Sequence, residues 1–154
     1  MLTTPQIVTT QAQRAAVIRL SIARSEMMKT FGPAVAELRA TLAAQGVRAA
    51  GPVFAHHLTM SDQRFDFQLG VVVDRAVTAS GRVEPGGLPA AVVARAVYSG
   101  AYEGLSSAWG ALMGWIKDAG REPAADLWEV YVVGPQTATD PADWRTELYR
   151  PLKG

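Results

Sequence analysis

The stretch Leu127–Val133, with the sequence LWEVYVV, is apolar apart from Glu129 and predicts a buried β-strand. An ionised carboxylate that leaves water is costly unless it is paired, hydrogen-bonded or protonated. Glu129 therefore indicates either a buried site that offsets this cost or an edge strand whose glutamate points to water. Alternation places Glu129 on one face with Leu127 and Tyr131, and it leaves both alternatives open.

Composition bounds the class of protein. Of the 154 residues, 49% are hydrophobic and 19% are charged, which is typical of one globular domain. The formal net charge of +1 gives no electrostatic case for nucleic acid or an anionic membrane surface. No apolar run could span a bilayer, no signal peptide begins the chain, and cysteine is absent. We expect a soluble cytoplasmic domain over residues 1–154, without cofactor or metal.

The chain contains two similar halves, pseudo-repeats over about residues 7–77 and 88–152. Ala15–Leu20 aligns with Ala90–Arg95, and both segments are strand-like and precede a helix. After each helix comes another strand, Pro52–His57 in the first half and Ala125–Tyr131 in the second. This alignment places Ala55 opposite Glu129.

Apolar stripes predict one long helix in each half. The first stripe contains Met28, Phe31, Val35, Leu38 and Leu42, and the second contains Leu105, Trp109, Leu112, Met113 and Ile116. Gly32-Pro33 predicts a short helical turn followed by a longer helix from about Pro33, and Gly104 predicts a similar break. Gly46 and Gly120 are expected at the helix ends.

A last strand is expected in each half, Phe65–Val73 and Trp144–Leu152, with Ser80–Pro89 as the linker. The fold class is then α+β. Duplicated strand–helix–strand–strand units form antiparallel sheet, with helices on one face and a ligand pocket at the pseudo-two-fold seam. An alanine on one side of that seam and Glu129 on the other predict an asymmetric site.

Several segments, in this order, resemble the GyrI-like domain, also called the bacterial transcription-activator effector-binding domain. They are Leu88–Ala90, Val97–Leu105, Trp109–Ile116, Trp128–Tyr131 with Gly134-Pro135, and Trp144–Leu152. The first half also fits, so the resemblance runs from about residue 7 to the end. Ala101 departs from the family pattern, because many relatives have proline there.

The resemblance implies a duplicated α+β fold around a pocket for lipophilic, often cationic or aromatic, compounds. In family members the glutamate matching Glu129 lies at the pocket base among aromatic side chains. Activators of this family carry a helix-turn-helix domain ahead of this one, and the sequence has no room for it. We therefore expect a stand-alone protein that binds a small molecule and no nucleic acid, with its oligomeric state open.

The candidate ligand-binding residues are Glu129, Trp109, Tyr131, Tyr149, His57 and Tyr102. A desolvated aromatic face would add about 0.5–2 kcal/mol to the binding of a cation. For Trp109 the alternative is core packing on the helix stripe. Trp128 alternates away from Glu129 and is expected to pack on a helix from the opposite face.

His56 and His57 are adjacent on a predicted strand, so their side chains point to opposite faces and do not favour a shared metal ion. His57 shares the face of Ala55, which makes it a candidate hydrogen-bonding group or general base.

Three functions fit the sequence. The first is a stand-alone binder that sequesters or senses drugs. The second is a hydrolase that opens the cyclopropane ring of DNA-alkylating natural products, with Glu129 as catalytic general base and a tyrosine hydroxyl that stabilises developing negative charge. The third is an inhibitor that docks on an enzyme such as DNA gyrase.

Overall fold

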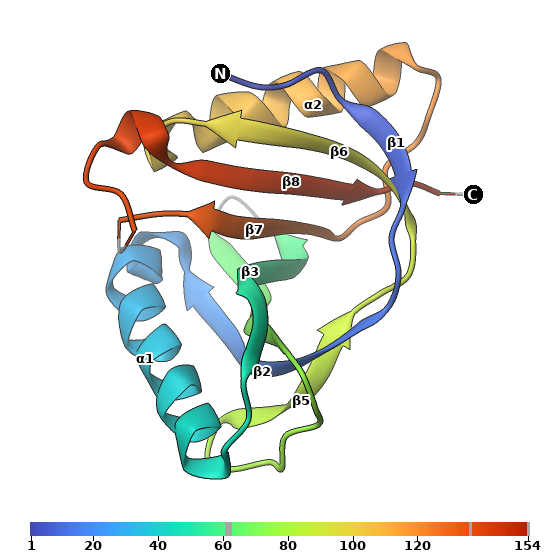
Figure 1. Ribbon diagram of the computed structural model, residues 1–154. Helices are drawn as coiled ribbons and strands as arrows, with labels where there is room; N and C mark the ends of the chain where they lie inside the picture. The colour runs from blue at the N-terminus through green and yellow to red at the C-terminus, as the bar shows by residue number, and fades with distance from the viewer. Residues whose placement is uncertain (61–62, 136, 154) are drawn as a thin grey trace. The chain divides into compact units, whose positions relative to one another are not determined.

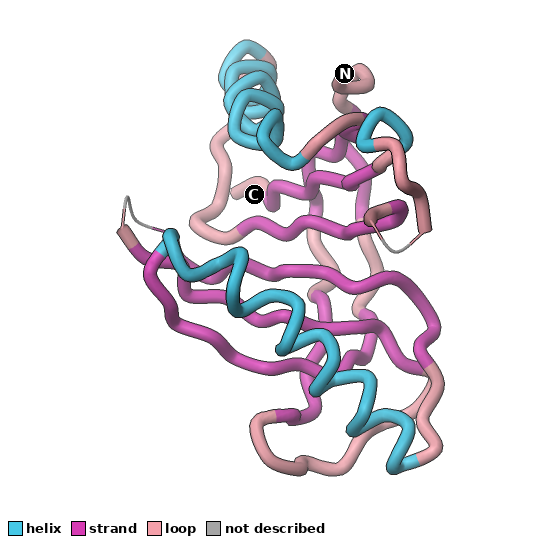
Figure 2. Tube along the Cα trace, turned by 90° about the vertical axis from the view of Figure 1, so that its left-hand side faces the viewer, coloured by secondary structure: helices cyan, strands magenta, loops and turns pink. Residues whose placement is uncertain are grey.

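A computed structural model describes residues 1–60, 63–135 and 137–153, without the side chains of Met28, Thr59 and Met60. The described chain divides into two compact units, Gln11–Ala90 (unit 2) and Met1–Thr10 with Ala91–Gly154 (unit 1). Figures 1 and 2 show that each unit combines antiparallel strands with one long helix, so the predicted α+β class is confirmed. No helix among the described residues is long and apolar enough to cross a membrane.

Unit 2 is a four-stranded sheet in the order β3-β4-β2-β5 with one helix. Its elements are β2 (Gln13–Ala23), the short helix η1 (Arg24–Glu26), α1 (Met27–Gln45), β3 (Ala49–Met60), β4 (Arg64–Val73) and β5 (Val83–Leu88). Helix α1 contacts β2, β4 and β5, and it contributes the buried residues Ala34, Leu38 and Leu42 to the core.

Unit 1 repeats this topology, with the strand order β1-β6-β8-β7. Its elements are β1 (Gln6–Thr9), β6 (Val92–Ser99), η2 (Tyr102–Gly104), α2 (Leu105–Asp118), β7 (Leu127–Val133), η3 (Pro141–Asp143) and β8 (Arg145–Pro151). In both units the third strand of the repeat lies between the first and the second. The predicted duplication of strand–helix–strand–strand units is therefore confirmed.

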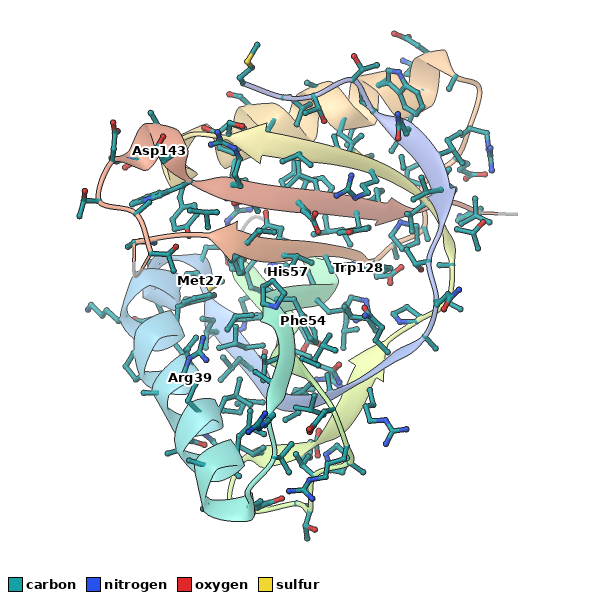
Figure 3. The ribbon with its side chains drawn as sticks, viewed as in Figure 1. Met27, Arg39, Phe54, His57, Trp128 and Asp143 are labelled. Atoms are coloured by element: carbon teal, nitrogen blue, oxygen red, sulfur yellow. The ribbon has the colours of Figure 1, made fainter. Side chains whose placement is uncertain are left out.

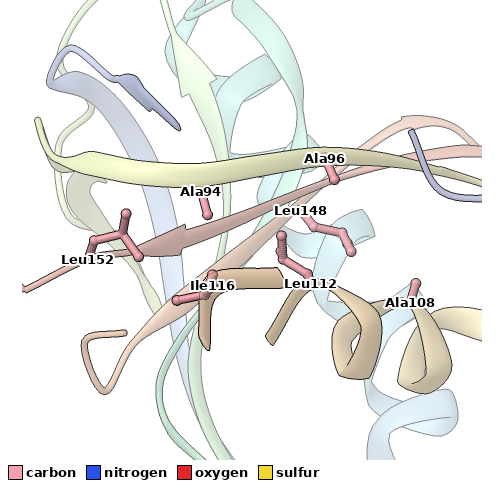
Figure 4. Packing of buried hydrophobic residues seen from close by; sticks show 7 residues of the cluster. All are labelled: Ala94, Ala96, Ala108, Leu112, Ile116, Leu148 and Leu152. Carbon is pink, nitrogen blue, oxygen red and sulfur yellow. The ribbon is translucent and has the colours of Figure 1, made fainter. Parts of the chain in front are cut away.

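The core of unit 1 lies between α2 and one face of its sheet. Figure 4 shows Leu112 and Ile116 of α2 packed against Leu148 of β8 and against Ala94 and Ala96 of β6. Leu148 pairs with Ala96 on one side and with Glu129 on the other. Glu129 therefore lies in the row of the sheet that faces the helix.

The register of the predicted repeat is wrong by three residues in the first strand. Leu69 pairs with both Ala55 and Ile18, just as Leu148 pairs with both Glu129 and Ala96. Ile18 thus corresponds to Ala96, whereas the sequence alignment matched Ile18 with Val93. A shift of three residues exchanges the two faces of the strand, and neither of the matched runs, AAVIRL and AAVVAR, alternates clearly enough to exclude it.

The linker and the first helix also differ from expectation. Ser80–Pro89 contains strand β5, whose Val83 and Leu88 are buried, and Pro85 is tolerated because β5 lies at the edge of the sheet of unit 2. Helix α1 runs without a break from Met27 through Pro33. Proline has no N–H group, so the carbonyl group of Lys29 has no donor within the helix. Lys29 and Pro33 are both exposed, so water can hydrate that carbonyl group.

The predicted helix ends are confirmed. Gly46 follows α1 with φ of 67° and Gly120 follows α2 with φ of 71°. This left-handed conformation suits glycine, which lacks a Cβ atom, and it ends each helix. A pocket between the two halves stays a prediction.

Candidate functional site

The Glu129 carboxylate is buried, with 8% of the residue exposed. Its two oxygens accept hydrogen bonds from different elements of unit 1. Trp109 of α2 donates its indole N–H to Oε2 at 2.6 Å, and Tyr131 of β7 donates its hydroxyl to Oε1 at 2.7 Å. The alternative in which Glu129 points to water from an edge strand is therefore wrong.

The local structure explains this geometry. Glu129 and Tyr131 are two residues apart on β7, so both side chains project from the same face of the strand. Trp109 belongs to the stripe of α2 that packs on this face of the sheet. The strand and the helix thus supply one donor each to the same carboxylate.

Two more aromatic side chains extend the cluster. Tyr102 of η2 meets Tyr131 edge to face, with 6.1 Å between ring centroids, and its ring lies 4.9 Å from that of Trp144. Trp144 donates its indole N–H to the Ala138 carbonyl, which fixes its ring. We call Glu129, Trp109, Tyr131, Tyr102 and Trp144 the Glu129 cluster.

The protonation equilibria in this cluster are displaced. Burial raises the pKa of the Glu129 carboxyl, while the hydrogen bonds from Trp109 and Tyr131 act to lower it. Burial and the negative charge of Glu129 raise the pKa of the Tyr131 hydroxyl well above its usual value, and they also raise the pKa of Tyr102. Both tyrosine hydroxyls are therefore neutral at physiological pH.

No basic side chain forms an ion pair with Glu129 among the residues that the structure describes. Hydrogen bonds from neutral donors only partly compensate a charge that has been taken out of water. The cluster thus holds a buried carboxyl group with two neutral donors and no cation from the described part of the chain.

Glu147 provides an internal comparison, because Glu147 and Tyr149 repeat the Glu-x-Tyr spacing on β8. The Tyr149 hydroxyl donates to Glu147 Oε1 at 2.9 Å, as Tyr131 does to Glu129. Here, however, Arg95 forms an ion pair with Glu147 Oε2 at 2.5 Å and also donates to the Tyr149 hydroxyl. The second Glu-x-Tyr pair therefore includes a cation, whereas the first has none among the described side chains.

Tyr149 does not join the Glu129 cluster. It pairs with Trp128 across β7 and β8 and with Arg95 across β6 and β8, which places all three on the sheet face opposite Glu129. Trp128 stacks on the Tyr149 ring, with 5.3 Å between centroids and 16° between planes. The prediction that Trp128 faces away from Glu129 is therefore confirmed, and α2 covers the face that holds Glu129. That Trp128 packs on a helix stays a prediction.

His57 lies in unit 2, where Figure 3 labels it on β3 together with Phe54. It is buried, its ring stacks on Phe67, and its edge meets Phe65. Burial lowers the pKa of His57 to about 4, helped by the nearby charges of His56 and Arg24, so the imidazole is neutral at pH 7. Among the described residues no group of three His, Asp or Glu side chains is placed to hold a metal ion.

The sequence interpretation did not single out Trp144 or Thr146 for this site. Trp144 lies between η3 and β8, outside any strand or helix. Its ring contact with Tyr102 therefore depends on the path of the chain before β8. Thr146 pairs with Tyr131 and Tyr98, is fully buried, and its hydroxyl has no hydrogen-bond partner within the described structure. An alternation count along β8 would place Thr146 on the face of Leu148, and the strand pairing was needed to place it beside Tyr131.

Solved structures share this fold. The C-terminal domain of EcmrR is 19% identical, with a TM-score of 0.85 and 97% of each chain covered. SAV2435, solved with tetraphenylphosphonium, is 13% identical, with a TM-score of 0.69 and coverage of 99% of this chain and 95% of that one. A hydrolase from Listeria innocua is 11% identical, with a TM-score of 0.69 and coverage of 97% and 91%.

This chain spans only 57% of the EcmrR chain in its complex with DNA, which matches with 20% identity and a TM-score of 0.83. No curated protein matches the chain. The model of the GyrI-like small-molecule-binding domain matches residues 3–153, nearly the whole sequence. The chain therefore belongs to the family of GyrI-like small-molecule-binding domains.

Proposed function

We propose that this domain binds lipophilic aromatic cations at the Glu129 cluster, as a protein that sequesters or senses such compounds. One observation carries the proposal. The buried Glu129 carboxylate has two neutral donors and no cationic partner in the described structure, whereas Glu147 has Arg95. A cationic ligand would supply at Glu129 the charge that Arg95 supplies at Glu147.

The surroundings of Glu129 favour an aromatic ligand. Trp109, Tyr131, Tyr102 and Trp144 are all partly buried. Trp109 and Tyr131 contact the carboxylate, Tyr102 contacts Tyr131, and Trp144 contacts Tyr102. A cation over such a ring gains about 0.5–2 kcal/mol, and more where water is excluded. One neighbour supports this choice, because SAV2435 was solved with the aromatic cation tetraphenylphosphonium.

The first test compares two dyes of nearly equal shape, 10-methylacridinium, which is cationic, and acridine, which is neutral at pH 7.5. Glu129→Gln removes the charge and keeps the size of the side chain. We expect it to weaken binding of the cation by about tenfold or more, and binding of acridine by less than about threefold. Dissociation constants from fluorescence titration give both numbers.

Glu147→Gln is the matched control, because it removes the same charge from the Glu-x-Tyr pair that already has Arg95. It should leave the affinity for both dyes unchanged. Equal losses for cation and neutral dye in Glu129→Gln would contradict ion pairing at this site.

A hydrolase is the second candidate, since the same cluster contains the elements of general-base catalysis. Burial raises the pKa and hence the basicity of Glu129, and the Tyr131 hydroxyl lies 2.7 Å from its carboxylate. Glu129 would take a proton from water as the water oxygen bonds to an electrophilic cyclopropane carbon. The ring C–C bond at that carbon would break, its electron pair would pass to the conjugated oxygen of the substrate, and the proton would follow to the opened product. A neighbour from Listeria innocua is described as a hydrolase.

Mass spectrometry tests this candidate. A cyclopropane-containing alkylator incubated with the wild type should gain the mass of one water, and the product should be absent with Glu129→Gln. Persistence of that product in the variant would remove Glu129 as the base. Docking on a partner such as DNA gyrase stays a prediction.

A further inference from the structure

We propose that the cation which binds at Glu129 is a planar N–H donor of the amidinium or guanidinium type, held by two parallel hydrogen bonds to the carboxylate. This inference rests on the proposed function, because it specifies the ligand of the same site. It ranks such donors above cations that carry charge but no N–H group, such as a phosphonium, which would pair with Glu129 by charge alone.

The protein's second Glu-x-Tyr pair shows which cation completes such a pair. Arg95 presents a planar guanidinium to Glu147, with one nitrogen 2.5 Å from the carboxylate and another donating to the Tyr149 hydroxyl at 3.2 Å. The same guanidinium lies over the Tyr149 ring, 5.6 Å from its centroid. One planar cation thus satisfies the carboxylate, the phenol and the aromatic face together.

Glu129 has the acceptor capacity for the same kind of group. A carboxylate offers about four lone-pair positions on its two oxygens. The described donors to Glu129 are Trp109 on Oε2 and Tyr131 on Oε1, one for each oxygen. A further acceptor position therefore remains on each oxygen, and a forked donor with two parallel N–H groups matches that spacing.

Desolvation makes these hydrogen bonds decisive. Only 8% of Glu129 is exposed, so its carboxylate contacts little water. A bound ligand displaces that water and must itself supply the hydrogen bonds. A quaternary cation offers no N–H group, and its substituents would keep its charge away from the oxygens. An amidinium brings both the charge and the donors.

The experiment compares three ligands that share a naphthalene ring: 2-naphthamidinium, trimethyl(2-naphthyl)ammonium and neutral 2-naphthamide. Calorimetric titration of the full chain gives each dissociation constant for the wild type, Glu129→Gln and the control Glu147→Gln. We expect the wild type and the control to bind the amidinium about tenfold or more tightly than the quaternary cation. In Glu129→Gln this advantage should disappear.

The outcomes separate the two proposals. Equal wild-type affinity for both cations, with both weakened in Glu129→Gln, would overturn the N–H donor and leave the cation site standing. No loss of either cation in Glu129→Gln would overturn the cation site itself. Thermal unfolding confirms that each variant is folded, and the wild-type comparison alone still decides the inference if Glu129→Gln does not fold.

Discussion

At the scale of single residues, unit 1 contains two Glu-x-Tyr pairs that differ in their third member. Glu147 has Arg95, and both side chains of that ion pair are partly exposed, 24% and 32%, so the ion pair contributes little more than about 1 kcal/mol. Glu129 is buried and has Trp109 instead. Hydrogen bonds to a charged group contribute about 1.5–3 kcal/mol each, against a desolvation penalty of several kcal/mol for a buried ion. The two contributions are of similar size, so the cluster adds little net stability, which agrees with the proposed role of Glu129 in binding.

The sequence predicts part of this cluster. An acid in an apolar strand marks Glu129, alternation places Tyr131 on its face, and the helix stripe contains Trp109. Tyr149 and Trp144 show where the pattern fails. Alternation along β8 gives two faces but does not say which face meets Glu129, and only the pairing of Tyr149 with Trp128 places it opposite. Trp144 reaches Tyr102 through a loop, for which no periodicity exists.

At the scale of elements, glycine at position 70 determines how closely β3 and β2 approach β4. A Cβ atom there would lie 2.7 Å from the Phe54 ring, 2.8 Å from a Val17 methyl group and 2.9 Å from the Ala16 carbonyl oxygen. Phe54 and Val17 are fully buried, and the Ala16 carbonyl group is part of the backbone of β2. None of these three groups can move easily. Gly70→Ala should lower the free energy of unfolding by about 2–3 kcal/mol in urea titrations.

Gly110→Ala is the matched control, the same added methyl group at a helical position. Gly110 is exposed on α2, and a Cβ atom there would meet nothing within 4 Å. This variant should gain about 0.5–1 kcal/mol, because alanine favours helix and restricts the unfolded chain. Similar effects of the two substitutions would show that close packing at Gly70 is not what β4 requires.

The elements themselves were largely predictable. Apolar stripes and the following glycines located both helices, and alternation located β4 and β8. Strand β5 was missed because Pro85, Gly86 and Gly87 are typical of turns, although Val83 and Leu88 are buried at its ends. Gly86 and Gly87 lie within close reach of Val17 and of the Gln13 carbonyl group, so glycine here serves strand packing on β2. Composition alone does not separate this use of glycine from a turn.

At the scale of the whole molecule, two buried titratable groups make the stability of the chain depend on pH in opposite directions. His57 has a folded pKa of about 4, below its ordinary 6.5, so its contribution is present above pH 6.5 and is lost as the pH falls toward 4. Glu129 has a folded pKa above its ordinary 4.5, so the folded state binds the proton more tightly than the unfolded state. Its ionisation therefore costs stability as the pH rises above 4.5.

The difference in the free energy of unfolding between wild type and Glu129→Gln isolates the contribution of Glu129, because both proteins retain His57. At pH 7 the variant should be more stable by about 1–2 kcal/mol, because a neutral amide replaces an unpaired buried charge. Below pH 4.5 the advantage should vanish, because the wild-type carboxyl is then protonated in both the folded and the unfolded state. Urea titrations at several pH values measure this difference. A Glu129→Gln variant that is less stable than wild type at pH 7, and equal to it below pH 4.5, would mean that Trp109 and Tyr131 already satisfy the charge. Glu129 would then need no cationic ligand to offset its burial.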